Sequence, residues 1–254
     1  MRDSFGMQAQ LERVAVAAAA LVVAGVLTAC NALVPGTSCP MFPASSHWHA
    51  DVSAQPVRTN SPAIVASVGA TAGLKADFGS GLWDGGPIGI PYVVVPADQP
   101  RVSVTFDYDD ESDPGPYPVP PDAPIEGGPD ADGDRHILLV DEVACRLHEL
   151  YDAHPQPDGS WHAGSGATWD LRSNALRPAG WTSADAAGLP ILPGLVRYDE
   201  VAAGKVEHAI RLTVPVSRRS YLWPARHQAG STNDLDAPAM GQRFRLKATV
   251  DPAA

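Results

Sequence analysis

The feature that most limits the fold of this chain is a set of short apolar segments with the periodicity of β-strands. In some segments apolar and polar residues alternate, which places one face of a strand in a core and the other in solvent; in others the apolar run is continuous, as in a buried strand. These segments are 92–95, 102–108, 136–141, 145–151, 206–214 and 244–250. Glycine and proline, 23 and 25 of 254 residues, are frequent in the loops, and no long amphipathic helix competes. We therefore predict an all-β fold, a sandwich or jelly roll of many short strands with long loops.

Local signals refine this prediction. The short turn between 136–141 and 145–151 predicts a β-hairpin. Ser61 as N-cap, with Pro62 in the first turn, predicts a short helix. The segment 182–188 is expected to form at most a turn or two of helix.

The N-terminus has the features of an export signal. The uncharged apolar run 14–27 is too short for a comfortable membrane span but fits the core of a secretory signal peptide. It ends in Leu-Thr-Ala-Cys, which resembles the lipobox of bacterial lipoproteins and implies removal of residues 1–29 and lipidation (palmitate) of Cys30. Asn31 after the cysteine implies, in Gram-negative lipoproteins, export to the outer membrane. An ordinary cleaved signal or an uncleaved anchor remains the alternative.

Two cysteines remain after Cys30. In an oxidising compartment Cys39 and Cys145 are expected to form a disulfide, which would tie the N-terminal tether to the core. Two free buried thiols are the alternative. We expect a tether over 30–46 and one β-rich domain over 47–254, at the cell envelope or cell surface.

Charge and composition exclude some classes of protein. With 44% hydrophobic and 19% charged residues the chain is not disordered. The net charge of −11 argues against nucleic acid as a partner, since phosphate binding needs a basic surface.

Two acidic segments raise the question of Ca²⁺. Residues 107–113 hold five carboxylates, and residues 130–134 have aspartates at alternate positions, as at the start of a calcium-binding loop. Carboxylate oxygens are the hard ligands that Ca²⁺ prefers. However, Arg135 occupies the position where a calcium loop needs glycine, so solvated loops are favoured over metal sites. His47 and His49 form an HxH pair without a visible third ligand. We expect no metal and no cofactor, with Ca²⁺ as the alternative.

No motif of a nucleophilic serine, a zinc protease or a phosphate-binding loop is present, so carboxylates and histidines are the best candidates for catalysis. Glycoside cleavage needs two such groups with different protonation states. Asp170, between Trp169 and Leu171, would have a raised pKa if buried, and Glu207 is a further carboxylate. The residues chosen as catalytic are Asp185, Glu200, His208 and His227. The residues chosen for substrate binding are Trp181, Trp223, Arg197, Arg226 and Glu126. The two tryptophans were chosen because aromatic faces stack on sugar rings.

Long runs of this chain resemble a family of secreted bacterial proteins. They include 110–118, the run SNALRPAGWTSADAAGLPILPGLVRYDE at 173–200, 208–211 and WPARH at 223–227. The resemblance covers about 42–247 and implies an extracellular location, but no assigned chemistry. Family members continue past 247, so the chain is expected to lack a closing segment.

These observations favour an exported lipoprotein that acts on an extracellular polysaccharide, as a glycoside hydrolase or a lyase, by carboxylate and histidine acid–base chemistry. The alternatives are a non-catalytic module that binds carbohydrate or the envelope, and a structural envelope lipoprotein. An enzyme needs two such groups facing one site, whereas a binding module needs a flat aromatic strip.

Overall fold

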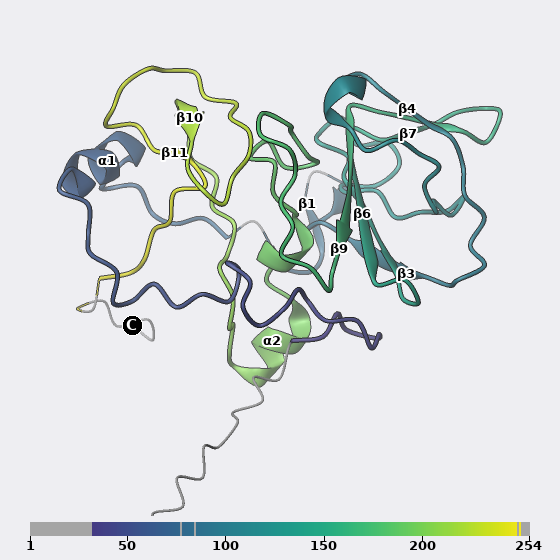
Figure 1. Ribbon diagram of the computed structural model, residues 1–254, viewed down its shortest axis with the longest axis horizontal. Helices are drawn as coiled ribbons and strands as arrows, with labels where there is room; N and C mark the ends of the chain where they lie inside the picture. The colour runs from purple at the N-terminus through teal and green to yellow at the C-terminus, as the bar shows by residue number, and fades with distance from the viewer. Residues whose placement is uncertain (1–31, 77, 84, 248, 250–254) are drawn as a thin grey trace, which may run out of the picture.

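The computed structural model describes residues 32–76, 78–83, 85–247 and 249. Within these residues the chain forms mostly short strands in several sheets, with two short α-helices, which confirms the all-β prediction (Figure 1). The predicted signal peptide and the lipidated Cys30 lie outside the described residues. In the part of the chain that is described, no helix has the length and apolar character needed to cross a membrane.

A four-stranded sheet forms the centre of the fold. It contains β3 (Tyr92–Val95), β5 (Ile137–Asp141), β6 (Arg146–Tyr151) and β9 (Ser165–Asp170), in the order β3-β5-β6-β9. β3 pairs with β5 in parallel, and the remaining pairs are antiparallel. β5 and β6 form the hairpin that the sequence predicted.

Both faces of this sheet are buried, which explains the continuous apolar run of β5. Leu138 and Val140 point into one hydrophobic cluster, whereas Ile137 and Leu139 point into a second cluster on the opposite face. The second cluster also contains residues of a three-stranded sheet, β4 (Val104–Phe106), β8 (Trp161–Ala163) and β7 (His154–Pro155), ordered β4-β8-β7. The two sheets therefore pack with a shared core, as in a small sandwich.

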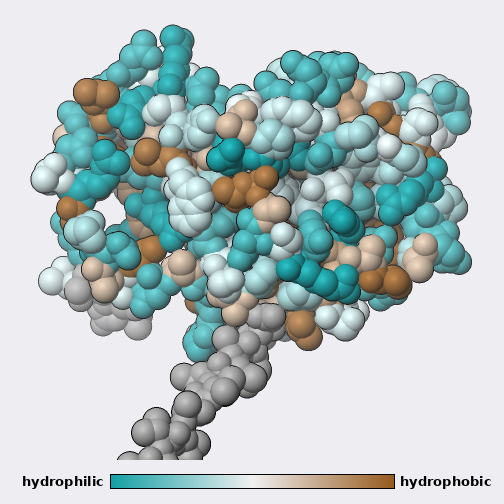
Figure 2. Space-filling view, in the orientation of Figure 1, coloured by the Kyte–Doolittle hydropathy of each residue, from teal (hydrophilic) through white to brown (hydrophobic). Residues whose placement is uncertain are grey.

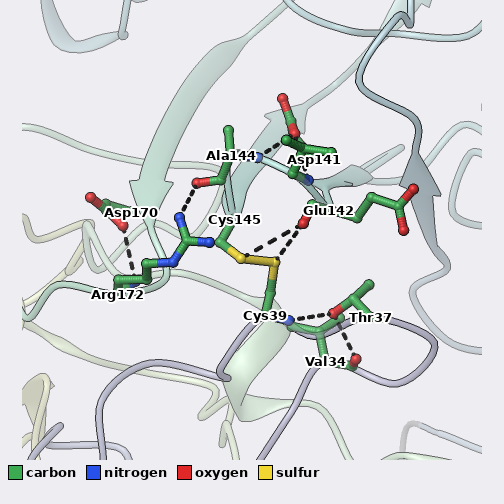
Figure 3. The surroundings of a disulfide bond; sticks show 10 residues. Val34, Thr37, Cys39, Asp141, Glu142, Ala144, Cys145, Asp170 and Arg172 are labelled. Carbon is green, nitrogen blue, oxygen red and sulfur yellow. Dashed lines mark hydrogen bonds between the residues drawn. A yellow bond between two sulfur atoms is a disulfide. The ribbon is translucent and has the colours of Figure 1, made fainter.

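The first cluster is covered by segments distant in sequence. Residues from 34–48 and from 184–192 pack on the sheet there. The Cys39–Cys145 disulfide, with a Cα–Cα distance of 5.3 Å, joins the N-terminal segment to the β5–β6 hairpin and confirms the predicted pairing (Figure 3). Beside it, the backbone N–H of Cys39 donates to Thr37 Oγ1, and that hydroxyl donates to the carbonyl of Val34.

The remaining elements are short and lie mostly outside the two packed sheets. α1 begins at Ser61, and Asn60 before it makes no capping hydrogen bond, so the prediction of Ser61 as N-cap was wrong by one position. Residues 182–188 form bends and turns rather than helix. The elements are α1 (Ser61–Val68), β1 (Leu82–Trp83), β2 (Gly86–Pro87), η1 (Asp109–Glu111), η2 (Leu192–Gly194), α2 (Tyr198–Ala203), β10 (Arg218–Tyr221) and β11 (Ala239–Met240).

The predicted strands at 206–214 and 244–250 were wrong as far as the described residues reach. Neither segment pairs with a neighbouring strand, and the side chains of Ile210, Leu212 and Leu246 are exposed. Alternation indicates which side of an extended segment is apolar, but a strand also needs a partner for its backbone groups. Here Ala209 N–H donates to Trp48 O and Arg211 N–H to Gly194 O, so 206–214 crosses loops instead of joining a sheet.

Candidate functional site

Two loops bring several of the predicted site residues together. Residues 180–188 and 222–227, which we call the loop platform, are joined by backbone hydrogen bonds from Gly180 N to Arg226 O (2.7 Å) and from Arg226 N to Ala187 O (2.9 Å). Gly188 has a φ of +66°, and a Cβ there would lie 2.5 Å from the carbonyl oxygen of Trp181 in its own loop and 3.2 Å from the backbone nitrogen of His227 in the other loop. The close approach of the two loops therefore depends on a glycine at 188.

The platform places His227 beside a carboxylate that the sequence did not single out. His227 Nε2 lies 3.8 Å from Glu111 Oε2, and His227 Nδ1 lies 2.9 Å from the carbonyl oxygen of Ala186. The backbone N–H of Thr182 donates to Glu111 Oε2 at 2.9 Å. About a quarter of each side chain is exposed, 24% for His227 and 29% for Glu111. This is a carboxylate–histidine pair with access to solvent.

Arg177 fixes the segment that carries Glu111. Its buried guanidinium donates to the carbonyl oxygens of Glu111 (2.7 Å) and Thr182 (2.6 Å) and forms an ion pair with Asp113 (2.5 Å). The Arg177 guanidinium also lies over the rings of Trp181 and Trp169, at 5.4 and 5.6 Å from their centroids. The predicted substrate-binding residue Trp181 thus has one face engaged by a protein cation.

Asp185 belongs to the same platform but is paired. Its Oδ2 lies 2.8 Å from Arg211 Nη2, and its Oδ1 accepts a hydrogen bond from Ala187 N. The carboxylate therefore holds the turn that also binds the His227 ring through Ala186. Arg226, the other predicted cation here, donates from Nε to the carbonyl of Arg177.

Glu200 and His208 lie close together in a separate, enclosed cluster. His208 Nε2 is 3.0 Å from Glu200 Oε1, and Arg197 pairs with the same carboxylate oxygen. Glu200 also accepts from Arg197 N–H at 3.0 Å, so it caps the first turn of α2. Only 3% of the His208 side chain and 7% of Arg197 are exposed. The burial of this cluster favours a structural role in anchoring α2.

Glu126 forms a third carboxylate–histidine pair, with His136 directly before β5. Its Oε2 lies 2.5 Å from His136 Nδ1, while His136 Nε2 lies 3.0 Å from Ala184 O. Burial opposes the charge on both groups, but their hydrogen bond and mutual attraction prevail: the pKa of His136 is raised and that of Glu126 lowered. The pair secures the 180–188 loop to the central sheet through Ala184.

Trp223 is the most exposed of the predicted aromatic contacts, with 66% of its surface free. The guanidinium of Arg243 lies 5.8 Å from its ring centroid, and the His47 ring approaches at 5.8 Å edge-on. Burial, together with Arg243 and His49, lowers the pKa of His47 to about 4. His49 Nε2 is 2.8 Å from Met41 O, so the HxH pair has its own protein contacts.

The acidic loops use several of their carboxylates for contacts within the protein. In 107–113, Asp113 pairs with Arg177, and Asp107 lies 3.2 Å from His162 Nε2. Arg135 directly follows 130–134, and its guanidinium donates to the carbonyls of Pro129 and Ala131. Among the described residues no three His, Cys, Asp or Glu side chains gather in a way that could hold a metal ion.

The other two carboxylates considered from sequence lie outside the platform. Asp170 is 40% exposed in its side chain and lies 4.0 Å from Arg146, so it does not occupy the buried apolar setting that the sequence suggested. Glu207 is an exposed partner of Lys205.

Sequence reasoning missed one further polar chain, on the outer face of the three-stranded sheet. Thr105 and His162 are register partners in β4 and β8, and Thr105 Oγ1 lies 3.0 Å from His162 Nδ1. With Asp107 on the opposite ring nitrogen, this chain borders an open hollow of about 570 Å³. Thr105 and His162 are 57 residues apart in sequence and meet only because β4 and β8 pair in this register. No local sequence motif predicts the contact.

Comparison with known proteins adds no relative: no family model, no curated protein and no solved structure matches this chain.

Proposed function

We propose that this protein is an exported lipoprotein that acts on an extracellular polysaccharide, with His227 and Glu111 as its acid–base pair. The observation that carries the proposal is the position of these two partly exposed side chains, 3.8 Å apart on the loop platform. A histidine and a carboxylate are the groups that the sequence led us to expect of an enzyme, and His227 is one of the four residues chosen from sequence.

The two groups act as one proton-transfer unit. They are too close to flank a glycosidic bond as two carboxylates do, about 5 Å or more apart. When Nδ1–H of His227 donates to the Ala186 carbonyl, Nε2 is the atom that accepts a proton from water or from a sugar carbon. The Glu111 carboxylate lies beside the same Nε2 and stabilises the positive charge of the imidazolium that forms. Proton removal from water serves inverting hydrolysis, and proton removal from a sugar carbon serves lyase chemistry; in either case the leaving sugar oxygen takes up a proton from an acid or from water.

Neighbouring groups supply contacts for a sugar. Trp181 and Arg226 lie on the platform, and Trp223 is four residues before His227 along the chain. Trp223 offers an exposed aromatic face, and such faces stack on pyranose rings. Asp185, Glu200 and His208 are paired with protein groups and serve to hold the surrounding loops.

The alternative function is a non-catalytic carbohydrate-binding module, and the exposure of Trp223 favours it. A binding module uses aromatic surface without proton transfer, so it would retain polysaccharide without forming products.

The location is part of the same proposal. Lipidation at Cys30 would place the domain at the cell envelope, a few residues before the segment 34–48 that packs on the central sheet and that the Cys39–Cys145 disulfide joins to the hairpin. Several acyl chains hold a protein stably on a membrane, at about 0.8 kcal/mol per buried CH₂. Mass spectrometry of the protein from its native membrane would detect a lipidated N-terminal cysteine, and an unmodified, differently cleaved N-terminus would contradict this part.

The function is tested by incubating the protein with a panel of polysaccharides. We expect new reducing ends or unsaturated products, and a loss of product with His227→Asn, whose amide can still donate to Ala186. His154→Asn is a matched control, because His154 is an exposed histidine paired with Asp152. Retention of polysaccharide without products would favour the binding module, and neither retention nor products from a folded protein would overturn both functions.

A further inference from the structure

Charge is unevenly distributed along this acidic chain. Residues 98–170 contain seventeen acidic and three basic residues, whereas 197–247 contain nine basic and five acidic residues. The central sheets and their loops are therefore strongly negative. The part of the chain that carries Trp223 and His227 is positive, although the whole protein has a net charge of −11.

Residues 218–247, which we call the basic segment, contain arginines that form no ion pair with a carboxylate in the part of the chain that is described. Arg226 and Arg243 donate to backbone carbonyls, of Arg177 at 2.9 Å and of His47 at 3.2 Å. Arg218 donates to a serine hydroxyl at 2.8 Å and Arg219 to the carbonyl of Gly230 at 3.4 Å. Hydrogen bonds to neutral oxygens position a guanidinium but leave its charge uncompensated.

The basic segment also carries the most exposed tryptophan of the predicted site. Trp223 is 66% exposed, and Arg243 lies 5.8 Å from its ring centroid. Arg226 is three residues further along the chain, on the loop platform beside His227. An aromatic face next to guanidinium groups suits a sugar ring that bears a negative charge, because the ring stacks while the anion accepts hydrogen bonds from arginine.

From these observations we infer that the polysaccharide bound at this surface is anionic, with carboxylate or sulfate groups on its sugar rings. The inference rests on the proposed function, since it names the substrate class of the same site. A neutral glycan can accept hydrogen bonds from arginine but offers no negative charge to compensate the guanidinium groups. The strongly negative sheets repel a polyanion at long range, so the basic segment determines where such a polymer can approach.

Two strands of the basic segment, β10 and β11, lie away from the negative sheets. In Figure 1 they lie, with α1, on the opposite side of the molecule from the packed sheets. Figure 2 shows hydrophobic residues as scattered patches on the mainly hydrophilic face that it displays.

The test measures affinity of the whole protein for polygalacturonate, for a sulfated galactan and for a neutral galactan of similar length. We expect at least one acidic polymer to bind about tenfold or more tightly than the neutral one, with affinity that falls as salt rises. Arg243→Gln and Trp223→Ala should each weaken acidic-polymer binding about tenfold. Arg146→Gln is the matched control, because Arg146 is an exposed arginine beside Asp170 on the negative sheet, and it should change affinity less than twofold.

The outcomes separate this inference from the proposed function. Binding of the acidic polymer without products supports the inference and leaves the enzyme without support. Products formed from neutral polymers alone support an enzyme and overturn the inference. Equal affinity for neutral and acidic polymers, or wild-type affinity in both variants, also overturns it. Binding of phosphatidylglycerol vesicles but of neither acidic glycan, lost in Arg243→Gln, would identify a lipid surface instead and overturn it as well.

Discussion

Glu149 offers a sharp test of the packing of this fold, because it is a fully buried carboxylate in the middle of β6. Its two oxygens accept hydrogen bonds from the backbone N–H groups of Ile191 and Leu192, at 2.9 Å. Burial nevertheless outweighs these bonds and raises the pKa of Glu149 from 4.5 to about 7. The native state therefore holds a proton that the unfolded state has already released over this pH range.

The sign and size of the effect follow from proton linkage. Where the native state binds more protons than the unfolded state, the free energy of unfolding falls as pH rises. A pKa that is raised from 4.5 to about 7 corresponds to about 3 kcal/mol, lost between those two pH values. Glu149→Gln removes the titrating group and keeps an oxygen that can accept from Ile191 or Leu192. The stability of the wild type relative to this variant should therefore fall by about 3 kcal/mol from about pH 4 to about pH 8.

Urea unfolding of both proteins at several pH values, followed by tryptophan fluorescence, measures this difference. The comparison cancels titrations that both proteins share, such as those of His47 and His148. Parallel stability curves for the two proteins would refute the reasoning. They would mean that the three backbone hydrogen bonds keep Glu149 ionised in the native state.

Three further predictions concern other parts of the framework. Replacing Cys39 and Cys145 by alanine should lower the free energy of unfolding by about 4–5 kcal/mol on the chain-entropy model, because the bridge spans 106 residues; urea titration measures it, and a loss below 1 kcal/mol would contradict it. Arg177→Met should cost about 3–5 kcal/mol, since Asp113 would lose its buried partner; a melting temperature equal to that of the wild type would show that the ion pair is dispensable. Burial, with Arg101 nearby, lowers the pKa of His148 to about 4; an NMR titration should find this imidazole neutral at pH 5.5, and a midpoint near 6.5 would contradict the packing around β6.

The central sheet could be predicted from sequence because its signals are local. The apolar run of β5, the hairpin to β6 and the run of β3 appear in the structure as expected. The pairing of Cys39 with Cys145 followed from counting the cysteines that remain after Cys30, on the expectation of an oxidising compartment. The strand prediction failed where a segment needs a neighbouring strand. Residues 206–214 have the alternation of a strand, but their backbone N–H groups donate to the carbonyls of Trp48 and Gly194, which lie outside the sheets.

The site could be predicted only in part, for the same reason. His227, Asp185, Trp181 and Arg226 were chosen individually, and the platform brings them together. Glu111 was one of five carboxylates in an acidic run, and nothing local distinguishes it from its neighbours. Its role depends on Arg177, which is 66 residues away and draws the two segments together through the Glu111 carbonyl.

The central claim, that His227 and Glu111 form one proton-transfer unit, is tested most directly by the rates of His227→Asn, Glu111→Gln and the double variant. On a polysaccharide that the wild type cleaves, each single variant should lose about 10²–10⁴-fold in kcat. The double variant should lose little more than the worse single one, because groups that act as a unit are not additive. Asp170→Asn, an exposed carboxylate outside the platform, is the control. Near-wild-type kcat in His227→Asn, or losses that simply multiply in the double variant, would contradict the account.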